Sequence, residues 1–318
     1  LQPPGLGFIL RAGKPKAARF TVFDLNSQGF AIAEVGLVNG ALRIITCQFV
    51  HNANVKIRGE LIKEFLDRRN VSTSVCQLVM SQTNYKFLLA EAPKAPLDNL
   101  RALMPTKIRD SIPWELNDIT SDVLELPDDA YRGRKKSVYV AVAKTATLSS
   151  QIDLLHGVGV QPDSVTTLEV AMRGYWSLLK LEANASVAIM RLTETGGVLV
   201  VMCDGLLYLA RRVAVSLDAL QQEDCDRQEI FDQIVLEIQR SVDFYESQLG
   251  KGSITKLIVL PPPIDLGIGL DYIDQNINTA MELFDPYSVL GFTQELTLRD
   301  QCYCSAALGA ALGGLLDA

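Results

Sequence analysis

The chain has 318 residues, of which 48% are hydrophobic and 21% are charged, and its formal net charge at pH 7 is −7. This length exceeds what one hydrophobic core usually supports, so we expect two domains rather than a disordered or fibrous chain. The acidic balance argues against nucleic-acid binding, because there is no excess of Lys and Arg to neutralise phosphates. The two histidines, His51 and His156, lie in no recognisable motif, which argues against a histidine-rich metal site.

Membrane insertion and secretion are not predicted by any segment. The longest uncharged run, residues 301–316, is rich in Gly, Ala and Ser and is shorter than the ~20 apolar residues that a span needs. Residues 1–19 carry basic residues and no acid, so we expect a flexible basic segment rather than a signal peptide. The cysteines show no C-x-x-C spacing, so buried, reduced thiols and no metal site are expected, as in a cytoplasmic protein.

Three apolar, strand-like runs open the folded part of the chain. Asn39-Gly40 between the second and the third is a strong hairpin signal, because both residues tolerate a positive φ. The next apolar residues recur at helical spacing behind Asn54, which is a suitable N-cap. The expected elements are strands at 20–25, 30–37 and 42–50, a helix at 55–69 that buries Ile57, Leu61, Ile62, Phe65 and Leu66, and a strand at 74–80.

An inserted small α+β subdomain is predicted at about residues 83–143. Pro105 and Pro113 fall within a helical pattern, so a kink or a break is expected there. The expected elements are a strand at 85–90, a helix at 98–117 and strands at 123–126 and 137–143. A helix at 147–157, a strand at 164–167 and a helix at 168–181 complete the first half.

The second half repeats the order of the first. Its expected elements are strands at 185–192, 197–202 and 206–215, a helix at 227–249, a strand at 255–260, a helix at 266–284, a strand at 287–290 and a terminal helix at 302–316. A long internal repeat predicts a duplicated, two-lobed α/β fold with a cleft. We expect a first lobe at 20–182 and a second at 183–318. The Ser305, Gly309, Gly313 spacing favours close packing of the terminal helix, back against the first lobe.

This duplicated order with an insertion resembles the actin-like (ribonuclease H-like) ATPase superfamily. Within it, the chain resembles the PilM-like pilus-biogenesis proteins, most closely the MshI type of the mannose-sensitive haemagglutinin (MSHA) pilus. The resemblance covers most of the chain from about Arg19 onward. The residues that carry it are RSVDFYESQ at 240–248, SIPWEL at 111–116, Asp285-Pro286, and AALGAAL at 306–312.

The resemblance implies that ATP and Mg²⁺ would lie between two hairpin loops, one from each lobe. The matching residues are Asp24, Asn26, Ser27 and Gln28 in the first loop, and Thr193, Thr195 and Gly196 in the second. Asn26 stands where the family prefers Gly, Arg191 replaces an Asp, and Glu194 would repel phosphate. Three prolines at 261–263 replace the Gly-rich turn that receives adenosine, and they offer no N–H donor. We therefore expect a degenerate ATPase without a cofactor or catalytic residue.

The resemblance also implies a partner, because PilM-like proteins capture the cytoplasmic N-terminal tail of a PilN-like bitopic inner-membrane protein. The walls of the groove would be the helix at 55–69 and the strands near 85–90 and 138–143. Candidate contacts are Tyr85, Phe87 and Trp114. We predict a cytoplasmic scaffold of a type IV pilus assembly platform, held at the inner membrane through its partners.

Two alternatives remain open. An active actin-like ATPase or phosphotransferase would need intact phosphate loops and a carboxylate that positions the nucleophile. The cytoplasmic domain of a type II secretion platform protein would be followed by a membrane span, and none is visible before Ala318.

Overall fold

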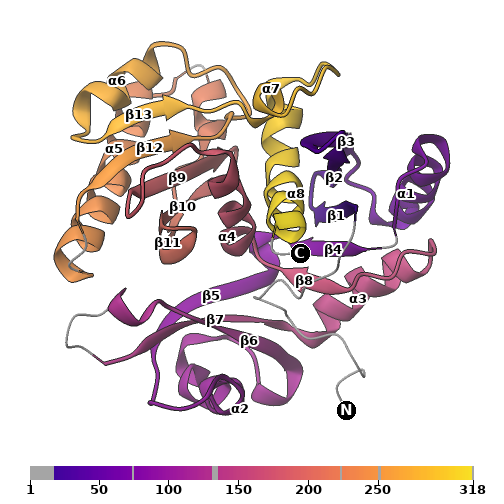
Figure 1. Ribbon diagram of the computed structural model, residues 1–318, viewed down its shortest axis with the longest axis horizontal. Helices are drawn as coiled ribbons and strands as arrows, with labels where there is room; N and C mark the ends of the chain where they lie inside the picture. Colours follow the sequence, from indigo (N-terminus) through magenta and orange to yellow (C-terminus); the bar gives the residue numbers. More distant parts are fainter. Residues whose placement is uncertain (1–17, 74, 131–134, 223, 250–251, 317–318) are drawn as a thin grey trace. The chain divides into compact units, whose positions relative to one another are not determined.

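The computed structural model describes residues 18–73, 75–130, 135–222, 224–249 and 252–316 (Figure 1). The chain divides into two compact units. Unit 1 is formed by Leu1–Leu126, Gly133–Gly174 and Ala306–Ala318, and unit 2 by Pro127–Arg132 and Tyr175–Ser305. Most of the basic segment expected at 1–19 lies outside the described residues.

The main sheet of unit 1 has the strand order β3-β2-β1-β4-β8. Its elements are β1 (Arg19–Asn26), β2 (Gly29–Val38), β3 (Ala41–His51), α1 (Val55–Arg69), β4 (Cys76–Met80), α3 (Thr145–His156) and β8 (Ser164–Thr166). β1, β2 and β3 form antiparallel hairpins, whereas β4 runs parallel to β1. Asn39 and Gly40 have φ values of 52° and 75°, which confirms the predicted turn between β2 and β3.

Helix α1 forms as predicted, but one residue of its expected buried stripe is exposed. The Asn54 side chain accepts a hydrogen bond from Lys56 N (3.1 Å) and so caps the helix. Ile62 and Phe65 are buried, whereas Ile57 is exposed and Arg58 takes the buried position. Arg58 lies four and seven residues before Ile62 and Phe65, which places all three side chains on one face.

The inserted subdomain is a three-stranded sheet of order β5-β7-β6 with one helix on it. Its elements are β5 (Tyr85–Glu91), α2 (Leu97–Lys107), β6 (Ile119–Glu125) and β7 (Ser137–Lys144). α2 packs Leu100 and Met104 against Val140 and its neighbours in β7 (Figure 1). The helix ends about ten residues before the predicted boundary and is followed by a 3₁₀ turn at Arg109–Ser111, after which Ile112 is extended ahead of Pro113.

The helix predicted at 168–181 is shorter than expected, consisting of α4 (Leu168–Ala171) and a 3₁₀ segment at Met172–Leu178. Gly174 in that segment packs against α8 (Leu298–Leu316) inside unit 1. A Cβ atom at Gly174 would lie 1.9 Å from the Gly309 carbonyl oxygen and 2.6 Å from Gly313 N. The close packing predicted from the glycine spacing in α8 is therefore observed.

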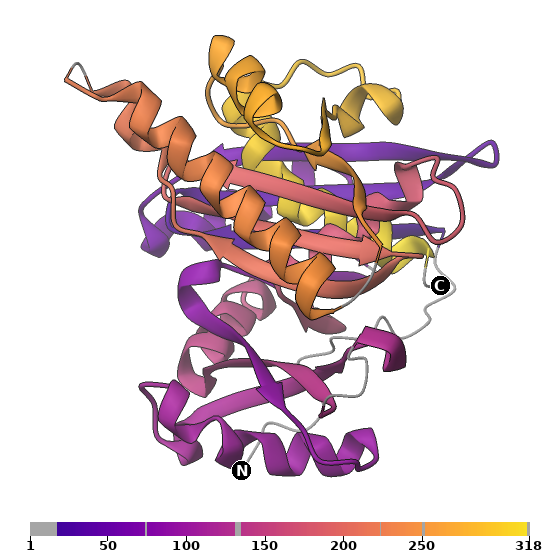
Figure 2. The same ribbon diagram turned by 90° about the vertical axis from the view of Figure 1, so that its left-hand side faces the viewer.

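Unit 2 has the strand order β11-β10-β9-β12-β13, which reproduces the order of the main sheet of unit 1. Its elements are β9 (Ser186–Thr193), β10 (Gly196–Cys203), β11 (Leu206–Val213), α5 (Arg227–Asp243), β12 (Ile254–Val259), α6 (Ile268–Asn276), β13 (Ala280–Leu283) and α7 (Pro286–Val289). Figure 2 shows α5 lying across this sheet. The predicted internal repeat is confirmed.

Three predictions in unit 2 are wrong in detail. The helix predicted at 266–284 is α6 followed by β13, which pairs in parallel with β12. The strand predicted at 287–290 lies in α7, because the Asp285 carboxylate accepts from Tyr287 N and Ser288 N and Pro286 is the first helical residue. α5 ends at Asp243 and continues as a π-helical turn at Phe244–Gln248.

Candidate functional site

The first loop, between β1 and β2, is closed by its own side chain. Asn26 Oδ1 accepts hydrogen bonds from Gln28 N (3.0 Å) and Gly29 N (3.1 Å). Phosphate loops bind anions through backbone N–H groups of this kind. Two such donors are therefore occupied here by the residue that replaces glycine, while Ser27 and Gln28 are exposed.

A buried arginine accompanies Asp24, the carboxylate of the first loop. Arg58 reaches from α1, and its Nη2 donates to the Asn52 carbonyl oxygen at 2.8 Å. Burial lowers the pKa of Arg58, whereas the charge of Asp24 acts to raise it, so the two groups attract each other. A cation from the chain itself thus lies in the field of the carboxylate that would organise Mg²⁺. Sequence reasoning missed Arg58, although its helical register with Ile62 was the available signal.

The second loop, between β9 and β10, is also closed internally. Thr193 Oγ1 donates to the Gly196 carbonyl oxygen (2.7 Å) and accepts from Thr195 N (3.3 Å). Its neighbour Arg191 is buried and holds the first turns of α8, with Nε 2.6 Å from Ser305 Oγ and Nη2 3.0 Å from the Cys302 carbonyl oxygen.

Glu194 holds the same part of α8 from the loop side. Its carboxylate accepts from Tyr303 Oη (2.9 Å) and from Arg299 Nε (3.0 Å). Burial and the nearby Glu194 charge raise the pKa of Tyr303 to about 12, so the phenol remains a protonated donor at neutral pH. Arg191 and Glu194 therefore both hold the first turns of α8.

The residues of the two loops do not fit Mg-ATP. Backbone donors are used by Asn26 and Thr193, and Arg191 is enclosed by α8. Pro261, Pro262 and Pro263, which follow β12, are buried. Within the described residues, no group of three His, Cys, Asp or Glu side chains is placed to hold a metal ion.

We expect Mg-ATP to leave the melting temperature of the protein unchanged. A ligand at 100 times its Kd would stabilise the fold by about 2.7 kcal/mol, which is roughly 5–10 °C for units of this size. Differential scanning calorimetry in 5 mM Mg-ATP and in MgCl₂ alone measures the difference in melting temperature. A rise of several degrees that Asp24→Ala abolishes would contradict the prediction.

The three predicted partner contacts do not share one surface. Tyr85 is buried, and its hydroxyl donates to Glu169 Oε2 (2.6 Å) and accepts from Leu168 N (3.1 Å). Phe87, on the same face of β5, stacks on Tyr139 with ring centroids 4.7 Å apart. Trp114 packs into the subdomain core against the opposite face. Tyr85 thus joins β5 to α4, Trp114 packs in the subdomain core, and Phe87 remains partly exposed.

Strand β5 itself offers a backbone edge for a partner. It pairs with β7 on one side, and among the described strands it has no neighbour on the other. Leu89 is 41% exposed on this strand, between the exposed Lys86 and Glu91. An extended peptide can add to such an edge through main-chain hydrogen bonds, with apolar side chains supplying specificity.

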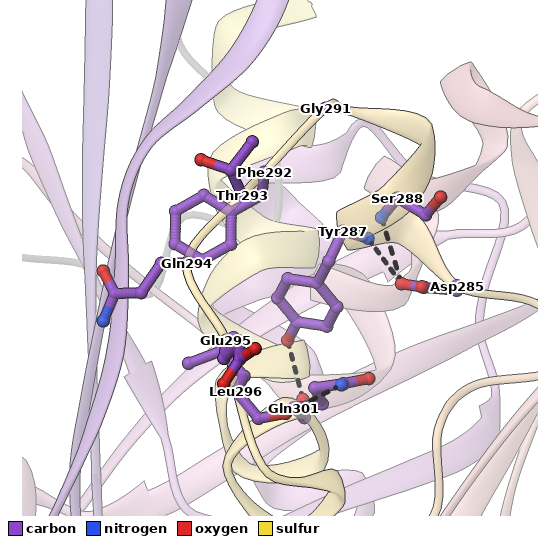
Figure 3. A pocket seen from close by; sticks show the side chains of 10 residues that line it. All are labelled: Asp285, Tyr287, Ser288, Gly291, Phe292, Thr293, Gln294, Glu295, Leu296 and Gln301. Carbon is purple, nitrogen blue, oxygen red and sulfur yellow. Dashed lines mark hydrogen bonds between the residues drawn. The ribbon is translucent and has the colours of Figure 1, made fainter.

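A recess in unit 2 contains none of the predicted site residues. It has a volume of about 530 Å³ and lies along the connection between β13 and α8. Figure 3 shows the Tyr287 ring pointing down to the Gln301 carbonyl oxygen, which its hydroxyl binds at 2.7 Å, while Asp285 points back to cap α7. The side chains of Asp285, Tyr287 and Gln301 each bond to backbone groups of the same segment.

Comparisons with known proteins identify the fold. No known protein-family model and no curated protein sequence matches the chain. The chain is similar to a solved PilM-PilN type IV pilus biogenesis complex, with a TM-score of 0.70 and 16% identity over 95% of this chain and 99% of the other.

Two further solved structures are similar. One is the cytoplasmic domain of EpsL, an inner-membrane component of the type II secretion system of Vibrio cholerae (TM-score 0.50, 15% identity, covering 88% of this chain and 97% of the other). The other is a Bacteroides thetaiotaomicron protein with an actin-like ATPase fold and unknown function (TM-score 0.51, 8% identity, covering 83% and 90%). The chain has an actin-like, two-lobe α/β fold. No helix among the described residues is long and apolar enough to cross a membrane.

Proposed function

We propose that this protein is a non-catalytic scaffold of a type IV pilus assembly platform, of the MshI type, and that it works at the inner membrane. Its partner would be the cytoplasmic N-terminal tail of a PilN-like bitopic membrane protein. The similarity to the PilM-PilN complex, which extends over 95% of the chain, supports this assignment. The main structural observation behind this proposal is the edge of β5, which has no neighbour among the described strands. This edge supplies a binding surface that needs no cofactor.

The internally closed loops support a scaffold over an ATPase. Catalysis of phosphoryl transfer depends on donors and a metal ion held around the transferred group. Here the side chains of Asn26 and Thr193 accept from backbone N–H donors of the two loops. Arg58 brings positive charge next to Asp24, and Arg191 stands where the family has an aspartate. The polar groups that would hold a nucleotide instead stabilise the fold.

Capture of the tail is tested by isothermal titration calorimetry with a synthetic peptide of the tail encoded beside the gene. Leu89→Lys should weaken binding by roughly tenfold, because it removes an apolar contact at the edge of β5. Leu206→Lys is the matched control, since Leu206 is a similarly exposed leucine (47%) on a strand of unit 2. If the Leu89→Lys and Leu206→Lys variants bound the peptide equally well, the placement of the peptide at the edge of β5 would be wrong. If the unchanged chain did not bind the peptide, the proposed function would be wrong.

The similarity to the EpsL domain supports a second assignment, to a type II secretion platform. The same titration separates the two, with a tail peptide from the secretion system as the competitor. Preference for the pilus peptide favours the pilus platform, and preference for the secretion peptide favours the alternative.

A further inference from the structure

Strand β5, whose outer edge is the proposed binding surface, begins with a buried side chain. Tyr85 is 1% exposed, so its side chain is not available to a peptide at the edge. It pairs with Ala143 of β7, which pairs in turn with Thr120 of β6. β7 then runs directly into α3, which begins at Thr145. These residues therefore mark the end of the subdomain sheet that joins the rest of unit 1.

The Tyr85 hydroxyl attaches this end of β5 to the start of α4. It donates to Glu169 Oε2 at 2.6 Å and accepts from Leu168 N at 3.1 Å. Glu169 is 2% exposed, so removal of the phenol would leave a buried carboxyl oxygen without this donor. α4 follows β8 after a single residue, so the phenol links the edge strand to the main sheet of unit 1.

The other parts of the subdomain sheet are attached by different contacts. Thr120 Oγ1 lies 2.9 Å from Thr145 Oγ1, which is a hydrogen bond between two neutral hydroxyls. The connection between β6 and β7 is held within unit 2, where Asp129 Oδ1 accepts from Tyr208 Oη at 2.8 Å. Neither contact involves β5, whose own attachment to the main sheet is the Tyr85 hydroxyl.

The direction of β5 matters because a strand edge binds a peptide through a row of backbone hydrogen bonds. Such bonds have N···O distances within a narrow range of about 2.7–3.2 Å. Leu89 lies four residues beyond Tyr85, which is about 13 Å along an extended strand. A tilt of about 5° at Tyr85 would therefore move the backbone at Leu89 by roughly 1 Å, which exceeds that range.

We propose that Tyr85 and Glu169 position the edge of β5 for capture of the tail and do not touch the tail themselves. This inference rests on the proposed function and adds to it the residues that fix the geometry of the binding surface. The tail would contact the part of β5 from Lys86 to Glu91, while the phenol holds the buried start of the strand.

Calorimetric titration with the tail peptide tests this role through the Tyr85 hydroxyl. Tyr85→Phe keeps the buried ring and removes the hydroxyl, so it should weaken binding by roughly fivefold. Glu169→Leu removes the acceptor and should weaken binding at least as much. Glu169→Gln retains an amide oxygen that accepts from the phenol, so its Kd should stay within about twofold of that of the unchanged chain.

Tyr175→Phe is the matched control for a general loss of stability. Tyr175 is buried in unit 2, and its hydroxyl donates to the Ser305 carbonyl oxygen at 2.7 Å. This variant loses a comparable buried hydrogen bond, but it should bind the peptide as the unchanged chain does. Circular dichroism should show that all variants fold.

Hydrogen–deuterium exchange of the free protein tests the positioning without the peptide. The amides of β5 and of its partner β7 should exchange roughly threefold faster in Tyr85→Phe, because this end of the sheet is less firmly held. The amides of β9 and β10 in unit 2 should exchange at unchanged rates.

The outcomes separate this inference from the proposed function. If Tyr85→Phe bound the peptide as tightly as the unchanged chain, or if Tyr175→Phe weakened binding equally, the positioning role would be wrong and the proposed function would stand. If the unchanged chain did not bind the peptide, the proposed function would be wrong and the role of Tyr85 in capture with it. Unchanged exchange of β5 in Tyr85→Phe would overturn the positioning role whether or not the peptide binds.

Discussion

Replacing Gly174 by Ala should destabilise unit 1 by about 3–5 kcal/mol, the largest effect that we expect from a single methyl group. The added Cβ would lie 1.9 Å from the Gly309 carbonyl oxygen and 2.6 Å from Gly313 N, so the 3₁₀ segment and α8 would have to separate. Both contacts are with backbone atoms, which cannot rotate away as a side chain can. Urea unfolding followed by far-UV circular dichroism measures the loss.

Gly252→Ala is the matched control for this substitution. No atom lies within 4 Å of the position of its added Cβ. Its stability should stay within about 0.5 kcal/mol of the unchanged chain. If Gly174→Ala behaved like Gly252→Ala, the close contact between Gly174 and α8 would be wrong.

Replacing Arg191 by Met should destabilise unit 2 by about 2–4 kcal/mol. Met has a similar length and leaves no buried charge, so the loss reports the hydrogen bonds to Ser305 Oγ and to the Cys302 carbonyl oxygen. The sequence contains two tryptophans, Trp114 in unit 1 and Trp176 in unit 2. Fluorescence-detected urea unfolding in a Trp114→Phe background therefore follows unit 2 through Trp176.

Arg227→Met provides the comparison, because Arg227 is exposed at the start of α5. It should change the stability by less than about 0.5 kcal/mol. If Arg191→Met were equally harmless, Arg191 would not hold α8, and the second loop would be open to an anion.

The strand order was predictable because the strongest signals were local. Asn39-Gly40 places two residues with positive φ between apolar runs and forms the expected turn, and Asp204-Gly205 has the same two positive φ values between β10 and β11. The secondary-structure predictions failed where a helix N-cap determines the conformation of a segment whose apolar residues suggest a strand. Tyr287 to Leu290 looks strand-like, yet the Asp285 cap and Pro286 start a helix there.

The site was predictable only in part, for a physical reason. The sequence indicates that Asn26 and Arg191 depart from the family pattern, but not where their polar groups bind. The contacts of Arg191 join it to residues 111 and 114 positions away in the sequence. Trp114 shows the same limit, because the sequence made it a candidate partner contact without indicating its neighbours, whereas in the structure it packs, partly buried, against the subdomain core.

Titration of the tail peptide with and without Mg-ATP tests most directly whether this fold binds a partner without a nucleotide. We predict the same Kd, within about twofold, in 5 mM Mg-ATP and in MgCl₂ alone, because the loops are closed by Asn26, Thr193 and Arg191 in either condition. If binding of the peptide required Mg-ATP, or if Mg-ATP abolished it, the protein would not be a nucleotide-independent scaffold.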